Sequence, residues 1–183
     1  QFDPAGVTVD LDSGTATDGF GDTDTLIDIE NVIGSEFGDA LSGDGGANSL
    51  TGRDGDDSLE GRGGNDFLTG STGADVLTGG GGADSFLYVS ADEAGDTIED
   101  WETGVDTILI VGDVFPGGLS SGVLPALQFF EGTEATDANH RFGYDPATGN
   151  VFFDEDGLGG ADAVVLATLI GAPEFTNTDI VVI

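Results

Sequence analysis

The sequence predicts an all-β chain: a parallel β-roll with capping strands before it and a β cap after it. Three features predict this fold. Six nonapeptides follow one another without a gap from Gly34 to Leu87. Their first position is always Gly, and their sixth is Asp in five repeats and Asn in one. Their eighth position is apolar, and the residues there are Leu41, Leu50, Leu59, Leu68, Leu77 and Phe86. Self-similarity at a short fixed period is typical of a solenoid of stacked units.

Each nonapeptide is expected to contain a turn of six residues and a strand of three. The turn needs residues with φ > 0, which Gly adopts without steric cost. The apolar eighth residue points inward, and because one repeat cannot bury it alone, the repeats must stack. Two nonapeptides make one full turn of the roll, so residues eighteen positions apart share an edge. The side chains expected to meet there are Asp39 with Asp57, Asn48 with Asp66, Asp57 with Asp75, and Asp66 with Asp84.

The oxygens that such turns gather predict a bound metal ion. Ca²⁺ is a hard cation that combines carboxylate and backbone carbonyl oxygens, and a nine-residue Gly/Asp repeat is typical of its sites. The charge agrees, since the chain has 36 acidic and 3 basic residues and a net charge of -33. Residues 34–87 hold ten of these acids and two arginines, so about four divalent ions would neutralise them. Without ions, the crowded carboxylates oppose folding, and we expect disorder.

The chain is expected to have three parts: residues 1–33 as capping strands, 34–90 as the roll, and 91–183 as the cap. Residues 26–33 form an apolar segment within the first part. Val32 stands nine residues before Leu41, so we expect this segment to join the roll in register with the repeats.

Residues 91–183 lose the nine-residue period and read as further strands. A hairpin is predicted where residues 141–145 and 150–154 flank a Pro-Ala-Thr-Gly turn. Residues 163–170 and 179–183 are predicted strands, the last one at a sheet edge. Residues 121–131 are the one segment expected to be helical. The aromatic residues here are expected to form the core of the cap rather than a sugar-stacking surface: Trp101, Phe129, Phe130, Phe142, Phe152 and Phe153.

Composition and motifs exclude several classes of function. The chain has no Cys, hence no disulfide or thiol metal site, and no apolar run long enough to span a membrane. Its acidity disfavours nucleic acid and anionic membranes as partners. The H-E-x-x-H zinc motif is absent. Gly118 to Gly122 match G-x-S-x-G, but Pro116 and Gly117 precede them and His140 is the only histidine, so a flexible loop is expected. The chain opens without a signal peptide, and we expect a fragment of a longer chain, with any catalytic domain upstream.

The repeats resemble those of the RTX family of bacterial exoproteins, which includes serralysin-type metalloproteases, lipases, haemolysins and alginate epimerases. GVTVDL and GDTDTLIDIENVIGS are similar to the segment that precedes the repeats in this family, and DTIEDWETGVDTI resembles the one that follows. RFGYDPATGNVFFDEDGLGGADAVVLATL resembles its C-terminal hairpin region. The residues from Asp179 to Ile183 look like the acidic-then-hydrophobic terminus of type I secretion substrates. The resemblance implies a secreted, extracellular protein with the type I secretion apparatus as a partner.

The resemblance also implies a set of ligands for each ion. Every ion would take the carbonyls of positions two and four and the sixth side chain from one repeat. From the repeat eighteen residues later it would take the carbonyls of positions one and three and the sixth side chain. The first would use Ser35, Phe37, Asp39, Gly52, Asp54 and Asp57; the second Asp44, Gly46, Asn48, Gly61, Gly63 and Asp66. The third would use Arg53, Gly55, Asp57, Gly70, Thr72 and Asp75; the fourth Arg62, Gly64, Asp66, Gly79, Gly81 and Asp84. Asp96, Asp100 and Asp106 are candidates for further sites. Phe37 replaces Gly, which predicts a distorted first turn, and the uncharged Asn48 predicts a weaker site.

The expected function is therefore a non-catalytic Ca²⁺-binding module that folds on binding extracellular Ca²⁺ and supports type I secretion of a larger exoprotein. The alternative is an adhesin segment or a carbohydrate-binding module. Three arginines and no lysine suit a neutral glycan better than a polyanion. The parent protein's activity, the exact number of ions and the oligomeric state do not follow from the sequence.

Overall fold

A computed structural model describes residues 5–158 and 163–183 of the chain. Within these residues the regular structure is almost entirely β, with three short 3-10 helices, η1 Ala91–Glu93, η2 Ala126–Gln128 and η3 Asn177–Asp179. The first strands are β1 Thr8–Asp10, β2 Thr15–Thr17, β3 Thr23–Thr25 and β4 Asn31–Ile33. The repeats form β5 Ala40–Ser42, β6 Ser49–Asp54, β7 Ser58–Glu60, β8 Phe67–Thr72, β9 Val76–Thr78 and β10 Ser85–Tyr88. The remainder forms β11 Asp96–Ile98, β12 Thr107–Ile110, β13 Gly122–Val123, β14 Phe129–Glu131, β15 Phe142–Asp145, β16 Asn150–Phe153, β17 Val164–Leu169 and β18 Ile180–Val182.

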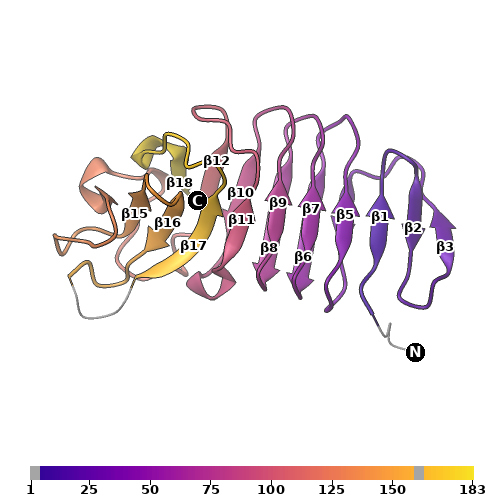
Figure 1. The fold of residues 1–183 in the computed structure, drawn as a ribbon, viewed down its shortest axis with the longest axis horizontal. Helices are drawn as coiled ribbons and strands as arrows, with labels where there is room; N and C mark the ends of the chain where they lie inside the picture. Colours follow the sequence, from indigo (N-terminus) through magenta and orange to yellow (C-terminus); the bar gives the residue numbers. More distant parts are fainter. Residues whose placement is uncertain (1–4, 159–162) are drawn as a thin grey trace.

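The repeats build the predicted parallel β-roll. Strands β5, β7 and β9 pair in parallel in one sheet, and β4, β6, β8 and β10 in the other (Figure 1). Leu59 stands in register with Leu41 and Leu77, each two repeats away. The apolar eighth residues are at most 1% exposed in all six repeats. Two repeats per turn and an inward-facing eighth residue are therefore confirmed.

The sheets continue beyond the repeats at both ends. At the N-terminal end β1 pairs in parallel with β5, and β2 and β3 add antiparallel strands, so β3 is one edge of the 11-stranded sheet. Val32 pairs with Leu50, as its spacing predicts. At the other end β11 adds to β9 and β12 adds to β10 (Figure 1). Hydrogen-bonded sheets thus cross both expected boundaries, and the division into three domains stays a prediction.

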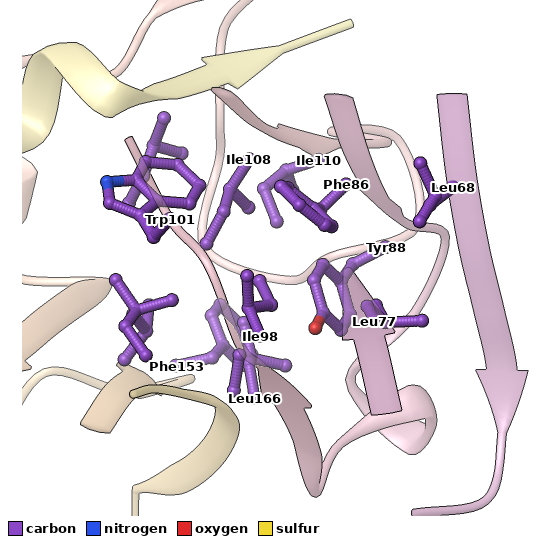
Figure 2. Packing of buried hydrophobic residues seen from close by; sticks show 14 of the residues in the cluster. Leu68, Leu77, Phe86, Tyr88, Ile98, Trp101, Ile108, Ile110, Phe153 and Leu166 are labelled. Carbon is purple, nitrogen blue, oxygen red and sulfur yellow. The ribbon is translucent and has the colours of Figure 1, made fainter. Parts of the chain in front are cut away.

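The C-terminal strands form a β cap that shares one core with the roll. The predicted hairpin is present as β15 and β16, and β17 joins it to β11. Figure 2 shows Phe153 and Leu166 of the cap beside Ile98 and Trp101, which lead into the side chains of the roll. Five of the six aromatic residues expected in the core are buried, and Phe129 packs against it partly buried.

Two expectations for this part are wrong. The segment from Ser121 to Glu131 is not a helix: it contains the single turn η2 between β13 and β14. Leu124 and Phe130 are buried, and Phe130 lies in β14; Pro125 begins the turn without a side-chain cap. The last strand, β18, is not an edge, because it lies between β12 and β13. Its Ile180 is fully buried, so core burial decides its place.

Among the described residues, no helix has the length and apolar character needed to cross a membrane.

Candidate calcium-binding turns

The structure brings the sixth side chains together along each edge of the roll. On the first edge, Oδ1 of Asp57 accepts the backbone N–H of Asp39 at 2.7 Å, and Oδ1 of Asp75 accepts that of Asp57 at 2.8 Å. Oδ1 of Asp39 in turn accepts the N–H of Val7 at 2.6 Å. Asp57 and Asp75 therefore each face the preceding turn of their edge with Oδ1.

The second edge repeats this arrangement. Oδ1 of Asp66 accepts the N–H of Asn48 at 2.7 Å, and Oδ1 of Asp84 accepts that of Asp66 at 2.8 Å. These sixth side chains are at most 5% exposed on both edges. The four pairs expected eighteen residues apart are thus neighbours in the structure.

Three of these carboxylates each have an oxygen that nothing in the structure satisfies. Oδ2 of Asp57, Asp66 and Asp75 is buried and has no hydrogen-bond partner in residues 5–158 and 163–183. Burying an ionised oxygen without a partner is costly, so such groups are normally paired or bound to a metal. The three orphaned oxygens therefore fit a cation between successive turns.

Backbone carbonyls point to the same places. A Cβ added to Gly52 would lie 2.0 Å from Oδ2 of Asp57 and 2.9 Å from the carbonyl oxygen of Gly70, one turn further on. At Gly61 the corresponding distances are 2.3 Å to Oδ2 of Asp66 and 2.5 Å to the carbonyl oxygen of Gly79. Oxygens of two turns thus converge beside the first glycine, and no side chain fits there. Carboxylate with carbonyl is the donor set that Ca²⁺ takes.

The backbone of repeats three to six has the shape that directs carbonyls inward. Position four has φ of 123° at Gly55 and 111° at Gly64. Position two is also left-handed, and it is occupied by Arg53 (φ 91°), Arg62 (φ 72°) and Ser71 (φ 75°) in repeats three to five. Left-handed residues other than Gly are uncommon and cost energy, so the surrounding turn must impose this conformation.

The first two turns differ. Ser35 and Asp44 hold position two, and their side chains accept the N–H of Phe37 at 3.1 Å and of Gly46 at 2.7 Å. Neither turn has a left-handed residue at position two or four, so the second turn shares the distortion predicted for the first.

Oxygens of the first two sixth side chains are also already engaged. Oδ2 of Asp39 accepts the N–H of Ser35 at 2.6 Å, and Oδ1 of Asn48 accepts that of Asp44 at 2.8 Å. The side-chain pairs of the first and second predicted ions are therefore neighbours, but they have fewer oxygen atoms free to bind an ion than the third and fourth pairs.

The electrostatics of the ion-free turns favour protonation. Burial is the main cause that raises the pKa of Asp57 from 3.8 to about 7; the charges of Asp75 and Asp39 contribute to this rise, and a backbone hydrogen bond opposes it. Burial, with the charges of Asp84 and Asp44, raises the pKa of Asp66 to about 6. A cation between the turns would remove the repulsion that underlies part of these shifts.

Asp96, Asp100 and Asp106, the candidates for further sites after the repeats, differ in the backbone groups that they accept hydrogen bonds from. Oδ1 of Asp96 and Oδ1 of Asp106 continue the two edges, accepting the N–H groups of Asp75 at 3.1 Å and Asp84 at 3.0 Å. Asp100 instead accepts the N–H groups of Gly79 and Gly80 through its two oxygens. Nowhere in residues 5–158 and 163–183 do three or more Asp, Glu or His side chains form a metal cluster on their own. Any site here therefore depends on backbone carbonyls.

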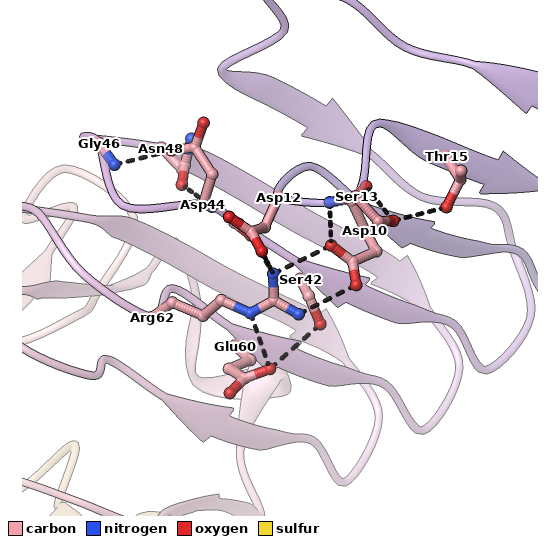
Figure 3. A network of polar contacts seen from close by, with 11 residues as sticks. Asp10, Asp12, Ser13, Thr15, Ser42, Asp44, Gly46, Asn48, Glu60 and Arg62 are labelled. Atoms are coloured by element: carbon pink, nitrogen blue, oxygen red, sulfur yellow. Dashed lines mark hydrogen bonds and ion pairs between the residues drawn. The ribbon is translucent and has the colours of Figure 1, made fainter.

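Sequence reasoning missed an ion-pair network that holds the first strand on the roll. Arg62 donates to both carboxylate oxygens of Asp10, at 2.9 and 3.0 Å (Figure 3). It also donates to the carbonyl of Gly43 at 3.0 Å. Its Nε lies 3.5 Å from Glu60. The hydrogen bond from Arg62 holds the pKa of Asp10 at about 2. The two partners are 52 residues apart, and no periodicity connects them.

Comparison with known proteins agrees with this geometry. The family model described as RTX calcium-binding nonapeptide repeat (4 copies) matches residues 33–68 and 60–87. Residues 33–87 are RTX calcium-binding repeats. Such repeats bind Ca²⁺, and the donor set of the described turns fits that ion. No curated protein matches the chain.

Two solved structures share the fold of this RTX-containing chain. The AlgE6R3 subunit of the Azotobacter vinelandii mannuronan C5-epimerase is 26% identical with a TM-score of 0.58, over 86% of this chain and 85% of that one. The AlgE6R2 subunit of the same enzyme is 22% identical with a TM-score of 0.55, over 85% of this chain and 94% of that one. The second likeness shows the fold alone. The likeness therefore extends well beyond the repeats.

Proposed function

We propose that this chain is a non-catalytic module that folds when it binds extracellular Ca²⁺ and that supports type I secretion of a larger exoprotein. The observation that carries the proposal is the set of orphaned carboxylate oxygens in the turns. A folded, ion-free roll has to bury these oxygens without a partner. Ion binding removes that cost, so the free energy of binding contributes directly to folding.

The third and fourth predicted ions have the best-formed sites. The third would lie between Asp57 and Asp75 with carbonyls of Arg53, Gly55, Gly70 and Thr72, and the fourth between Asp66 and Asp84 with carbonyls of Arg62, Gly64, Gly79 and Gly81. Both sites have an orphaned oxygen and two left-handed positions in the first turn. The first and second ions would bind more weakly, because Asp39 and Asn48 already accept hydrogen bonds from their own turns.

The test is a circular dichroism titration of the purified chain. In EDTA we expect a mostly disordered far-UV spectrum, and in millimolar Ca²⁺ a β spectrum with a higher Tm. Half-saturation should fall on the order of 10⁻⁴–10⁻³ M, as for extracellular calcium modules. Mg²⁺ is the control and should substitute poorly, because it prefers a tight octahedral shell and keeps its waters. Identical spectra with and without Ca²⁺ would contradict the proposal.

The export part of the proposal concerns residues 179–183. In the folded chain Asp179 and Ile180 are buried and β18 lies inside a sheet, so an exporter can read this segment only before folding. Low cytosolic Ca²⁺ would keep the chain unfolded at that stage. Deleting Asp179–Ile183 should abolish export from a cell with a matching type I exporter. Normal export of the truncated chain would move the signal elsewhere, most simply into residues 91–178.

A carbohydrate-binding module is the second candidate, favoured by the 26% identity to a subunit of a mannuronan C5-epimerase. A polyanion such as mannuronan suits this chain poorly. The net charge is -33, and the three arginines are engaged by Glu36, Asp10 and the carbonyl of Gly117. A glycan array in millimolar Ca²⁺ tests the second candidate. Binding to a neutral glycan supports it, and the absence of binding contradicts it and favours the folding and secretion module.

A further inference from the structure

The cap contains a groove whose lining residues are all outside the calcium-binding turns. Its volume is about 300 Å³, and it lies between the ends of β14 and β15 on one side and the segment that follows β17 on the other. The rings of Tyr144 and Phe175 line it, with centroids 5.2 Å apart, together with Pro146 and Pro173. A volume of this size is at the lower end for ligand pockets, so it suits one side chain or a small group.

The backbone that forms this groove is anchored. The hydroxyl of Tyr144 donates to the carbonyl of Pro173, and the hydroxyl of Thr103 donates to the carbonyl of Glu174 at 2.9 Å. Burial raises the pKa of Tyr144, with a further contribution from the charge of Asp145, so the hydroxyl keeps the proton that it donates. Because proline also has a fixed φ, the groove is formed before a ligand arrives, and binding there requires little ordering.

Two acidic side chains line the same groove. Glu131 and Glu174 are both exposed. In the part of the chain that the structure describes, neither of them forms an ion pair. The chain has no lysine, and its three arginines are engaged by Glu36, Asp10 and the carbonyl of Gly117. The groove is therefore complementary in charge to a cation that comes from outside the chain.

The apolar surface of the groove indicates the shape of that cation. Tyr144 is 2% exposed and Phe175 6%, which leaves too little of either ring for a sugar or an aromatic ring to stack on. An aliphatic stem needs only a narrow apolar contact. A lysine side chain lays its methylenes along such a surface while its ammonium group stays in water. An ammonium group on an aliphatic stem thus matches both the apolar and the acidic residues.

The groove also reaches the edge of a sheet. β14 ends at Glu131, and it is the edge strand of the 11-stranded sheet, in which β15 is its one partner among the described strands. The unpaired side of an edge strand is a template for a further strand. When an extended peptide adds to such an edge, its main chain supplies affinity, and pockets for its side chains supply specificity. A peptide is therefore the favoured source of the stem.

We propose that this groove, the cap groove, binds a lysine side chain of an extended peptide segment that pairs with β14. The methylenes of the lysine contact Tyr144, Phe175 and the two prolines, and its ammonium group lies near the carboxylates of Glu131 and Glu174. The partner is a protein with an exposed, lysine-containing strand or tail. This role goes beyond calcium-driven folding, because it belongs to the folded cap and uses none of the repeat carboxylates.

The first test is calorimetric titration of the full chain in saturating Ca²⁺ with two peptides. One is an acetylated and amidated six-residue peptide of alternating threonine and valine with one central lysine, and the other has norleucine in place of the lysine. We expect the lysine peptide to bind about tenfold more tightly, the effect of two exposed ion pairs. Equal affinity for both peptides overturns the proposal. Free n-pentylamine should bind more weakly than the lysine peptide, and equal binding of the two overturns the assignment of a peptide.

The second test changes the groove. Glu131→Gln and Glu174→Gln should each weaken binding of the lysine peptide by about two- to fivefold, the range for one exposed ion pair, and leave the norleucine peptide unchanged. Glu174→Lys should remove the preference for lysine, because it brings a competing ammonium group. Glu134→Gln is the control, since Glu134 is exposed, follows the same strand and does not line the groove.

An equal loss of affinity in Glu134→Gln would show diffuse charge attraction and would overturn the cap groove. Circular dichroism in saturating Ca²⁺ checks that each variant is folded, and the exposed positions of the substituted side chains make this the expected result. A wild-type chain that folds without Ca²⁺ would contradict the proposed function instead, and the peptide titrations would still decide the cap groove.

Discussion

At the scale of single residues, the first glycine of each repeat is required by crowding and not by its φ angle. Gly52 is not left-handed, yet a Cβ on it would lie 2.0 Å from Oδ2 of Asp57. The left-handed conformation is adopted instead at positions two and four, which Arg53 and Gly55 occupy in this repeat. Two different physical needs therefore produce the glycine pattern of the repeat.

Gly52→Ala should weaken calcium-driven folding. The added methyl enters the space where the Asp57 and Gly70 oxygens converge, and overpacking of this kind costs about 1–3 kcal/mol. Gly45→Ala is the matched control, because nothing lies within 4 Å of its Cβ position. Calcium titrations followed by circular dichroism measure both midpoints. Equal midpoints would show that the convergence point is not part of an ion site.

Asp66→Ala should weaken calcium binding more than Asp39→Ala. Asp66 faces the preceding turn with Oδ1, and its Oδ2 has no hydrogen-bond partner among the described residues, so in the proposed pairing it would serve two ions. Asp39 begins its edge within the repeats and already accepts the N–H of Ser35. Calorimetric titration of both variants compares the losses. Equal losses of calcium affinity in the two variants would mean that the pairing of side chains eighteen residues apart does not determine which residues bind each ion.

At the scale of elements, the roll is held by ladders of identical side chains rather than by long strands. Most of its strands have three residues, too few to be stable alone. Leu41, Leu59 and Leu77 stack in register in one sheet and are at most 1% exposed. Burial along these ladders, together with the ions at the turns, stabilises the stack.

Leu59→Ala should destabilise the calcium-bound fold by about 2–5 kcal/mol, since it opens a cavity between two fixed neighbours. Leu127→Ala is the control, because that side chain is 80% exposed. Urea unfolding in saturating Ca²⁺ gives both free energies. A loss below about 1 kcal/mol at Leu59 would show that the roll can collapse around the gap.

At the scale of the whole molecule, the stability of the ion-free fold depends on protons. The folded pKa values of Asp57, about 7, and Asp66, about 6, lie above the ordinary 3.8. Between these values the folded chain holds more protons than the unfolded one. The contribution of these two groups to stability is therefore fully present below about pH 4 and is lost as the pH rises to about 7.

In EDTA, the β signal should thus be stronger at about pH 5 than at about pH 7.5. In saturating Ca²⁺ the difference should shrink, because the ion replaces the protons at these carboxylates. Circular dichroism at both values, with light scattering to detect aggregation near the pI of 4.1, measures this. A β signal in EDTA that grows with pH would reverse the assigned sign.

The sequence by itself determined the roll, its two-repeat turn, the buried ladder and the calcium chemistry. Each follows from a strict nine-residue period, which places equal residues in equal surroundings. The hairpin of β15 and β16 was equally readable from its turn. The helix expected at residues 121–131 and the edge position expected for β18 were wrong, because outside the repeats burial against distant strands decides the outcome.

Only the tertiary structure decided which turns leave an oxygen free. Asp39 and Asp57 occupy the same position of the repeat, yet Oδ2 of Asp39 accepts the N–H of Ser35, whereas Oδ2 of Asp57 has no hydrogen-bond partner among the described residues. The structure also showed that Asp96 continues the first edge after Asp75, across a 21-residue spacing that breaks the period. A repeat pattern determines which residues are equivalent, whereas the ends of the stack, where neighbours are missing or replaced, depend on contacts between segments that no period relates.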